Sequence, residues 1–490
     1  MRRRIISSAA AVTFAFVTAA ASAQQSAPPS PAADRRVKEY VALINSGDRK
    51  AARAYAEQNL TPAALGRVPA AGRVNTISAL HDETRGVEIH SVGEPKPGQV
   101  EAVLRSRLAG EWWRLTLFLE PQPPHRIERL GMGLLSTPPD AGRAAEKLSD
   151  DGIARELDSF LRKVAEADAF SGAVLVAKDG RVLFEKAYGE ANKDFGAPNR
   201  VDTKFNLGSM NKMFTAVAIA QLAEAGKLSF DDPLAKFLPD FPDREAAAKI
   251  RIKHLLTHTS GLGSYFNERF IEGSRERFRT VDDFLELAKG ETLAFEPGTK
   301  WQYSNTGFLV LGKVVEKAAG QSYYDYVRER IFKPAGMTNT DSYDLDRVNQ
   351  NLAVGYQKEY GDEGLRYRNN IFRHVIRGGP AGGGYSTVGD LLRFATALRA
   401  GKLLSEASVK TLLAPKPELS SPEYGYGFGV SPERAIAGHS GGFTGISANL
   451  DMFLDSGYTA VVLSNYGGAA DRAVAKIQQL VTAGGKPRAN

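Results

Sequence analysis

The sequence predicts an α+β fold in two units, a small one over residues 34–135 and a larger one over residues 150–485. The first observation is length, because 490 residues exceed one average domain. The second is that each unit combines apolar residues at helical spacing with runs typical of strands. The third is the stretch 136–149, rich in proline, alanine and polar residues, which predicts a linker.

The composition is that of a globular protein, with 43% hydrophobic and 24% charged residues. It excludes a wholly disordered, collagen-like or polytopic membrane chain. The sequence has no cysteine, which excludes disulfides, thiolate metal sites and a cysteine nucleophile.

Residues 1–23 resemble an export signal peptide. Arg2, Arg3 and Arg4 precede an apolar stretch that ends in the small residues of a cleavage site, Ala21-Ser22-Ala23. The alternative is a membrane anchor, but the apolar stretch is short for a span of about 20 residues. We therefore expect an exported protein, periplasmic or secreted, with no integral membrane segment once the signal is removed. Removal of the signal and its three arginines lowers the net charge from +7 to +4, which is mild for a chain of this length. No basic stripe contains interleaved aromatic residues, so we expect no nucleic-acid partner.

The small unit follows residues 24–33, which predict a flexible tether. Apolar residues from position 37 to 44 recur at helical spacing, and a second helix is predicted over 50–58. Residues 100–108 and 111–119 predict a strand hairpin in which Trp112 and Trp113 point to opposite faces. Helices followed by a meander resemble the nuclear-transport-factor-2-like domains.

The larger unit begins with a predicted helix over 153–165 and a strand hairpin over 172–188. Residues 205–400 are mainly helical. Strands then return, and a last helix follows; the predicted ranges are 427–430, 435–439, 446–454, 458–464 and 469–481. Strands at both ends predict one sheet that carries a helical insertion, with a cleft where the two meet.

Ser209-Met210-Asn211-Lys212 is a Ser-x-x-Lys motif at the start of a predicted buried helix. Free backbone N–H groups in a first helical turn favour developing negative charge. Lys212 lies one turn away on the same face, and a buried amine could accept the hydroxyl proton of Ser209. Taken alone, the motif favours the alternative in which Ser209 caps the helix and Lys212 reaches solvent.

Tyr303-Ser304-Asn305 stands before a predicted apolar helix over 307–315. A tyrosine there can aim its phenol into a cleft as a proton relay, and Asn305 can bond a substrate carbonyl. The alternative is a core tyrosine followed by a capping residue.

Gly438-His439-Ser440-Gly441-Gly442 matches the nucleophile elbow of α/β-hydrolases, but none of the seven histidines follows Ser440. The elbow also leads into a helix, whereas a strand is predicted here. The remaining interpretation is an edge-strand motif lining the cleft. The N–H groups of Gly442 and Ser209 would then form an oxyanion hole.

These three motifs, in this order, resemble those of the penicillin-recognising serine hydrolases, which include class C β-lactamases, D-Ala-D-Ala carboxypeptidases and related esterases. The resemblance covers about residues 150–485. It extends to Leu255–Leu262, which resembles a hallmark turn of the family, and to Gly382–Thr387 with Asp390-Leu391, which resembles its cleft-bordering glycine-rich segment.

The resemblance implies an antiparallel sheet flanked by helices, with Ser209 as the acylated nucleophile and Lys212 and Tyr303 as general base and acid. Asn305, His439, Ser440, Gly441 and Gly442 would bind substrate or the oxyanion. His439 stands where many relatives carry lysine, and neutral histidine attracts a substrate carboxylate less strongly. We therefore expect hydrolysis of a small-molecule or peptide ester or amide, with weak or no β-lactamase activity.

His254 and His258 are spaced as zinc ligands on a helix, but no third ligand is evident, so we expect neither metal nor cofactor. The competing hypothesis is a non-catalytic penicillin-fold sensor or envelope scaffold. The sequence does not define the physiological substrate, the role of the small unit, the oligomeric state or which of Lys212 and Tyr303 is the acylation base.

Overall fold

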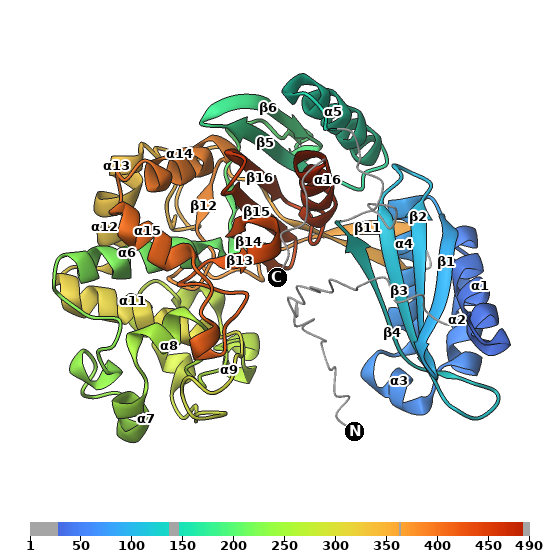
Figure 1. Cartoon of the computed structure of the whole chain (residues 1–490), viewed down its shortest axis with the longest axis horizontal. Helices are drawn as coiled ribbons and strands as arrows, with labels where there is room; N and C mark the ends of the chain where they lie inside the picture. Colours follow the sequence, from blue (N-terminus) through green and yellow to red (C-terminus); the bar gives the residue numbers. More distant parts are fainter. Residues whose placement is uncertain (1–27, 137–146, 362–363, 484–490) are drawn as a thin grey trace.

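The computed structural model describes residues 28–136, 147–361 and 364–483 (Figure 1). The expected signal peptide, residues 24–27 of the expected tether and residues 137–146 of the expected linker lie outside these residues. The described chain has the α+β architecture that the sequence predicts, and two sheets, one of four strands and one of six, form its two units.

The small unit packs helices on one face of a four-stranded antiparallel sheet in the order β1-β2-β3-β4. Trp113 is 7% exposed beneath the helices. Trp112 projects from the other face, where its ring lies 4.9 Å from that of His90. The prediction of opposite faces is thus confirmed. The elements are α1 (Pro31–Ser46), α2 (Arg49–Asn59), α3 (Pro62–Arg67), α4 (Ala70–Thr84), β1 (Val87–Lys96), β2 (Gln99–Ser106), β3 (Trp112–Leu119) and β4 (Ile127–Leu135).

Two expectations for this unit need correction. The tether does not extend to residue 33, because α1 begins at Pro31, with the Ser30 hydroxyl accepting from the N–H of Ala33. Helices α3 and α4 were not predicted. The small and polar residues of α4 blur its pattern, although Val74, Ile77 and Leu80 bury one face.

The larger sheet is antiparallel, with the strand order β13-β14-β15-β16-β5-β6. β16 pairs with β5 over its whole length, so both ends of the unit build one sheet, as predicted. The strands are β5 (Gly172–Lys178), β6 (Arg181–Tyr188), β13 (Gly429–Ser431), β14 (Ile436–Phe443), β15 (Ile446–Phe453) and β16 (Tyr458–Ser464).

Both faces of this sheet are covered. On β5, Val174 and Val176 face α5 (Asp150–Glu166) and α16 (Ala470–Thr482), whereas Leu175 packs into the core of the helical insertion. The insertion forms a lobe of helices: α6 (Asn211–Glu224), α7 (Arg244–Lys249), α8 (Ile252–Leu256), α9 (Glu268–Glu272), α10 (Val281–Leu285), α11 (Asn305–Ala319), α12 (Tyr323–Val327), α13 (Lys333–Ala335), α14 (Val388–Arg399) and α15 (Glu406–Leu413).

Six short strands of the described chain pair as three two-stranded sheets, β7 with β8, β9 with β12 and β10 with β11. They are β7 (Glu190–Asn192), β8 (Ala197–Pro198), β9 (Phe205–Asn206), β10 (Tyr356–Gly361), β11 (Gly364–Asn369) and β12 (Tyr385–Ser386). The hairpin of β10 and β11 interrupts the segment expected to be mainly helical, and in Figure 1 it reaches towards α4.

Buried charge joins the two units. Arg472 on α16 lies 3.4 Å from the Glu111 carboxylate and donates to the carbonyl of Glu83 on α4, and the Arg472 and Glu111 side chains are 3% and 6% exposed. Burial raises the pKa of neighbouring Asp471 to about 6. None of the described helices is long and apolar enough to cross a membrane.

Candidate active site

Ser209 lies in a tight 3₁₀ turn, Gly208–Met210, immediately before α6. The sequence predicts Ser209 in the first turn of the helix, whereas the helix begins only at Asn211. Gly208 adopts φ +51, and its N–H donates to the Asn206 side chain at 2.9 Å. This left-handed residue turns the chain from β9 into the helix and leaves Ser209 partly exposed.

Glycines allow three backbone segments to meet at this turn. A Cβ on Gly208 would lie 2.8 Å from the nitrogen of Gly442 on β14, and a Cβ on Gly382 would lie 2.7 Å from the oxygen of Gly208. A Cβ on Gly441 would lie 3.0 Å from the nitrogen of Ser209. Backbone atoms cannot rotate away as a side chain can, so only glycine permits this approach. The glycine-rich segment therefore borders the site, as the sequence analysis expected.

Lys212 is wholly buried on α6, and its Nζ faces three oxygens. They are Ser209 Oγ at 3.1 Å, Asn305 Oδ1 at 2.9 Å and the carbonyl oxygen of Ala381 at 2.6 Å. Burial without a carboxylate partner lowers the pKa of this amine well below its usual value. A neutral amine has two N–H groups and one lone pair. In the neutral form, the two oxygens that can only accept would take the N–H groups, and the lone pair would then face the Ser209 hydroxyl.

Tyr303 stands just before α11, whose N-terminus Ser304 caps by accepting from the N–H of Gly307 at 2.8 Å. Lys212 Nζ lies 4.9 Å from the centroid of the Tyr303 ring. Burial raises the pKa of the phenol, and its hydrogen bond with Ser209 opposes the rise. Tyr303 is therefore protonated at neutral pH and adjoins Ser209.

His258 holds the Tyr303 segment in place and belongs to the turn 255–262 that the sequence singled out. Its Nδ1 accepts from the N–H of Ser304 at 3.0 Å, its carbonyl accepts from the N–H of Gln302, and its ring packs 4.2 Å from that of Tyr303. His254 instead accepts from the N–H of Arg251. The two histidines thus have separate backbone partners. No cluster of three or more metal-ligating side chains occurs in the described ranges.

Asn305 begins α11, where its side chain bridges two groups. Its oxygen accepts from Lys212, and its nitrogen donates to Ser264 Oγ at 3.2 Å. The amide is thus oriented, with its nitrogen towards the lobe.

The motif His439-Ser440-Gly441 lies on β14, which continues as a strand to Phe443. A nucleophile elbow would instead lead from the strand into a helix. β14 is not an edge strand throughout, since β13 pairs with its first three residues, Ile436 to Gly438. β13 then ends. From His439 onward that side of β14 adjoins the Ser209 turn, so the edge-strand expectation holds only for the part that contains the motif.

His439 is neutral in this setting. Burial and the proximity of Lys212 lower its pKa to about 3. Its Nδ1 faces the Ser440 carbonyl, which can only accept, so Nδ1 carries the proton. Nε2 then accepts from the Tyr424 hydroxyl at 2.8 Å. This histidine supplies no charge to a substrate, as the sequence analysis expected.

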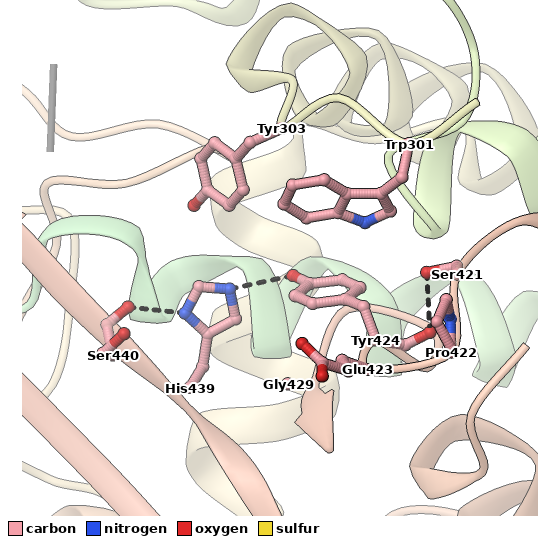
Figure 2. Close-up of a pocket in the computed structure, with 9 residues that line it drawn as sticks. All are labelled: Trp301, Tyr303, Ser421, Pro422, Glu423, Tyr424, Gly429, His439 and Ser440. Atoms are coloured by element: carbon pink, nitrogen blue, oxygen red, sulfur yellow. Dashed lines mark hydrogen bonds between the residues drawn. The ribbon is translucent and has the colours of Figure 1, made fainter. Parts of the chain in front are cut away.

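Two pockets adjoin these residues. The first, here called the aromatic pocket, has a volume of about 250 Å³ and is lined by Trp301, Tyr303, Glu423, Tyr424, His439 and Ser440, among others. Figure 2 shows Trp301 and Tyr303 on one side of it, with His439 and Tyr424 on the other. The second, here called the serine pocket, is lined by Ser209, Asn305, Gly442, Phe266, Phe270 and Phe443, among others. Each pocket is thus lined by part of the predicted site: Tyr303, His439 and Ser440 line the aromatic pocket, and Ser209, Asn305 and Gly442 line the serine pocket.

A model of the Beta-lactamase family matches residues 157–484. The chain belongs to this family and is a serine hydrolase. Penicillin-binding protein 4* of Bacillus subtilis (strain 168) is 33% identical over 330 residues, covering 64% of this chain and 71% of that protein. Esterase EstB of Burkholderia gladioli is 30% identical over 333 residues, covering 60% of this chain and 84% of that protein.

Solved structures agree with this assignment to the Beta-lactamase family. The crystal structure of a penicillin binding protein from Bacillus halodurans superposes with a TM-score of 0.60 at 31% identity. It covers 66% of this chain and 99% of its own. The larger unit thus has the fold of the family, and the small unit precedes the matched region.

Sequence reasoning missed several residues of this Beta-lactamase family site. The Ala381 carbonyl and the Ser264 hydroxyl carry no sequence signal, because their roles depend on tertiary placement. Tyr424 did carry one, since it opens an alternation of aromatic residues and glycine over 424–429 beside a predicted strand. Trp301 lies only two residues before Tyr303 and was overlooked.

Proposed function

We propose that Ser209 is the nucleophile of an acyl-transfer reaction in which an ester or amide is hydrolysed through a covalent acyl-enzyme. The observation that carries this proposal is the arrangement at Lys212 Nζ, which lies 3.1 Å from Ser209 Oγ. Two accepting oxygens occupy its N–H groups, so its lone pair is directed to the hydroxyl. A buried neutral amine in this position is a general base for serine.

In the proposed reaction Ser209 Oγ attacks the carbonyl carbon while Lys212 takes the hydroxyl proton. The negative oxygen of the tetrahedral intermediate is bound by the N–H groups of Ser209 and Gly442. Tyr303, protonated at the start, gives its proton to the leaving group as the bond to the carbonyl carbon breaks. The ammonium of Lys212, close to the phenol, then restores that proton.

Water completes the reaction. It attacks the carbonyl carbon of the acyl group on Ser209 and gives a proton to Lys212. As the serine oxygen leaves, the ammonium of Lys212 returns that proton to it and restores the hydroxyl. The products are the free acid and the alcohol or amine.

We infer that esters and amides without a carboxylate on the leaving group are preferred to β-lactams. Neutral His439 stands where many relatives carry lysine, so this position offers no positive charge to a β-lactam carboxylate. The preference for esters is supported by the similarity to a relative named as an esterase, EstB.

We also propose that the protein is exported, in periplasmic or secreted form, because its first 23 residues have the regions of a signal peptide. Residues 34–135 are proposed as a separate domain, because the apolar residues there form a cluster of their own. Arg472 and Glu111 would fix that domain to the catalytic one.

A substrate panel tests the proposed function. Nitrocefin, a peptide ending in D-Ala-D-Ala and short p-nitrophenyl esters are offered to the purified protein. We expect turnover of the esters to exceed that of nitrocefin, and the variant S209A to lose it. The matched control is S274A, which alters an exposed serine of the same lobe. Ester turnover that persists in S209A would contradict the assignment.

A further inference from the structure

The aromatic pocket lies on the side of the site where the proposed leaving group departs. Tyr303 lines it and is also hydrogen-bonded to Ser209. An acid that protonates a leaving group must touch that group. Ser209 itself lines the serine pocket, together with Asn305 and Gly442. The acyl part of a substrate is therefore directed into the serine pocket and its leaving group into the aromatic pocket.

The walls of the aromatic pocket are electron-rich. Trp301, Tyr303 and Tyr424 contribute rings, and a ring face attracts a cation through its quadrupole. These rings keep fixed places because they pack around the buried ring of His258, at centroid distances of 5.9, 4.2 and 4.6 Å. The Tyr424 hydroxyl is also held by its bond to His439. The rings thus form a preformed cage.

The charge in the pocket has one sign. Glu423 supplies a carboxylate, and no lysine or arginine is among the described residues that line it. His439 is held neutral, with its proton on Nδ1 and its Nε2 accepting from Tyr424. A carboxylate on a leaving group would therefore meet Glu423 in a pocket whose described lining includes no lysine or arginine. An ammonium would meet both that carboxylate and the ring faces.

We propose that the aromatic pocket is a leaving-group subsite for small cationic amines and amino alcohols, in which Glu423 and the faces of Trp301 and Tyr424 bind the ammonium. This inference rests on the proposed function, because it takes Ser209 as the nucleophile. The volume of about 250 Å³ accommodates a group of the size of choline or ethanolamine. The subsite selects substrates by the alcohol or amine that they release.

Two esters of one acid test this subsite. Acetylcholine and 3,3-dimethylbutyl acetate have the same shape and differ in one atom, nitrogen or carbon. We expect kcat/KM of the whole protein to favour the cationic ester by about tenfold, which is about 1.4 kcal/mol. In E423Q the ratio falls to near one, whereas E418Q, which alters an exposed glutamate of the same loop outside the pocket, keeps it.

A binding measurement separates this inference from the proposed function. Choline and 3,3-dimethylbutanol are titrated into S209A, and tryptophan fluorescence is followed, with W301F to show which change arises from Trp301. We expect choline to bind about tenfold more tightly than the neutral alcohol, and E423Q to remove the difference. Equal binding of the two alcohols, or a difference that survives E423Q, would overturn the inference.

The outcomes of the two experiments are distinct. Turnover of both esters at equal rates, lost in S209A, keeps the proposed function and refutes the subsite. Preferential binding of choline in S209A, together with ester turnover that S209A does not reduce, refutes the proposed nucleophile and keeps a cation-binding pocket.

Discussion

Replacing Gly441 by alanine perturbs the proposed oxyanion hole without touching any catalytic side chain. The added Cβ would lie 3.0 Å from the nitrogen of Ser209 and 2.9 Å from the carbonyl carbon of Leu207, and it would overlap the Leu207 oxygen. All three are backbone atoms. Carbon atoms in ordinary contact are separated by about 3.5–4.0 Å, so β14 and the Ser209 turn must move apart by about 1 Å.

Such a shift displaces the N–H of Gly442 relative to the N–H of Ser209. A misplacement of about 1 Å costs about 10²-fold in rate, and the loss of one oxyanion donor costs about 10²–10³-fold. We therefore expect kcat for a p-nitrophenyl ester to fall by about 10²–10³-fold in G441A. Thermal unfolding is followed in parallel to verify that the variant is folded.

The matched control is G467A. Gly467 lies near the same end of the sheet, but a Cβ there would meet its nearest neighbour, the nitrogen of Gly445, at an ordinary 3.5 Å. We expect this variant to retain kcat within about twofold. A folded G441A protein with the kcat of the wild type would refute the reasoning, because it would show that the close approach of β14 to Ser209 is not needed.

Three further predictions follow from the buried charges. In K212M, we expect kcat to fall by about 10²–10⁴-fold, because the general base is lost. In the wild type, we expect kcat/KM to rise with pH as Lys212 loses its proton, at a pKa below the ordinary 10.5. A kcat/KM that does not depend on pH would argue against Lys212 as the base. Because of His439, the unfolding free energy falls by about 2.3 kcal/mol from pH 6.5 to 4.5, since unfolded histidine takes up a proton near pH 6.5 and the folded ring only near pH 3. Denaturant titration of H439Q should lack this part of the loss. R472M loses about 3–5 kcal/mol of unfolding free energy, because it leaves the Glu111 carboxylate buried without its partner. Adding E111Q to R472M should restore part of this stability. If the losses of the two single variants simply add in the double variant, Arg472 and Glu111 are not coupled.

The larger sheet was predictable from the sequence because its strands are short apolar runs bounded by glycine and polar turns. The run Gly172–Lys178 is buried almost throughout, as are its pairing partners on β16. Helix α4 was not predictable in the same way. Its helical state depends on packing of Val74, Ile77 and Leu80, while its polar and small residues weaken any local signal.

The candidate site was only partly predictable. The order of motifs brought Ser209, Lys212, Tyr303 and Asn305 together correctly, because each motif carries side-chain chemistry. The Ala381 carbonyl, which holds Lys212 Nζ, could not be found, because backbone atoms have no sequence signature. The placement of Ser209 in a 3₁₀ turn was missed as well. A three-residue turn and a first helical turn share the same spacing of apolar residues.

Mass measurement of a trapped adduct tests the central claim most directly. The purified protein is treated with a fluorophosphonate, digested and mapped by tandem mass spectrometry. We predict one phosphonylated peptide, with the modification on Ser209. Labelling should slow by at least about 10²-fold in K212M, because the amine of Lys212 deprotonates the Ser209 hydroxyl in the wild type. A modification on another residue, or labelling of Ser209 at the same rate without Lys212, would contradict the account.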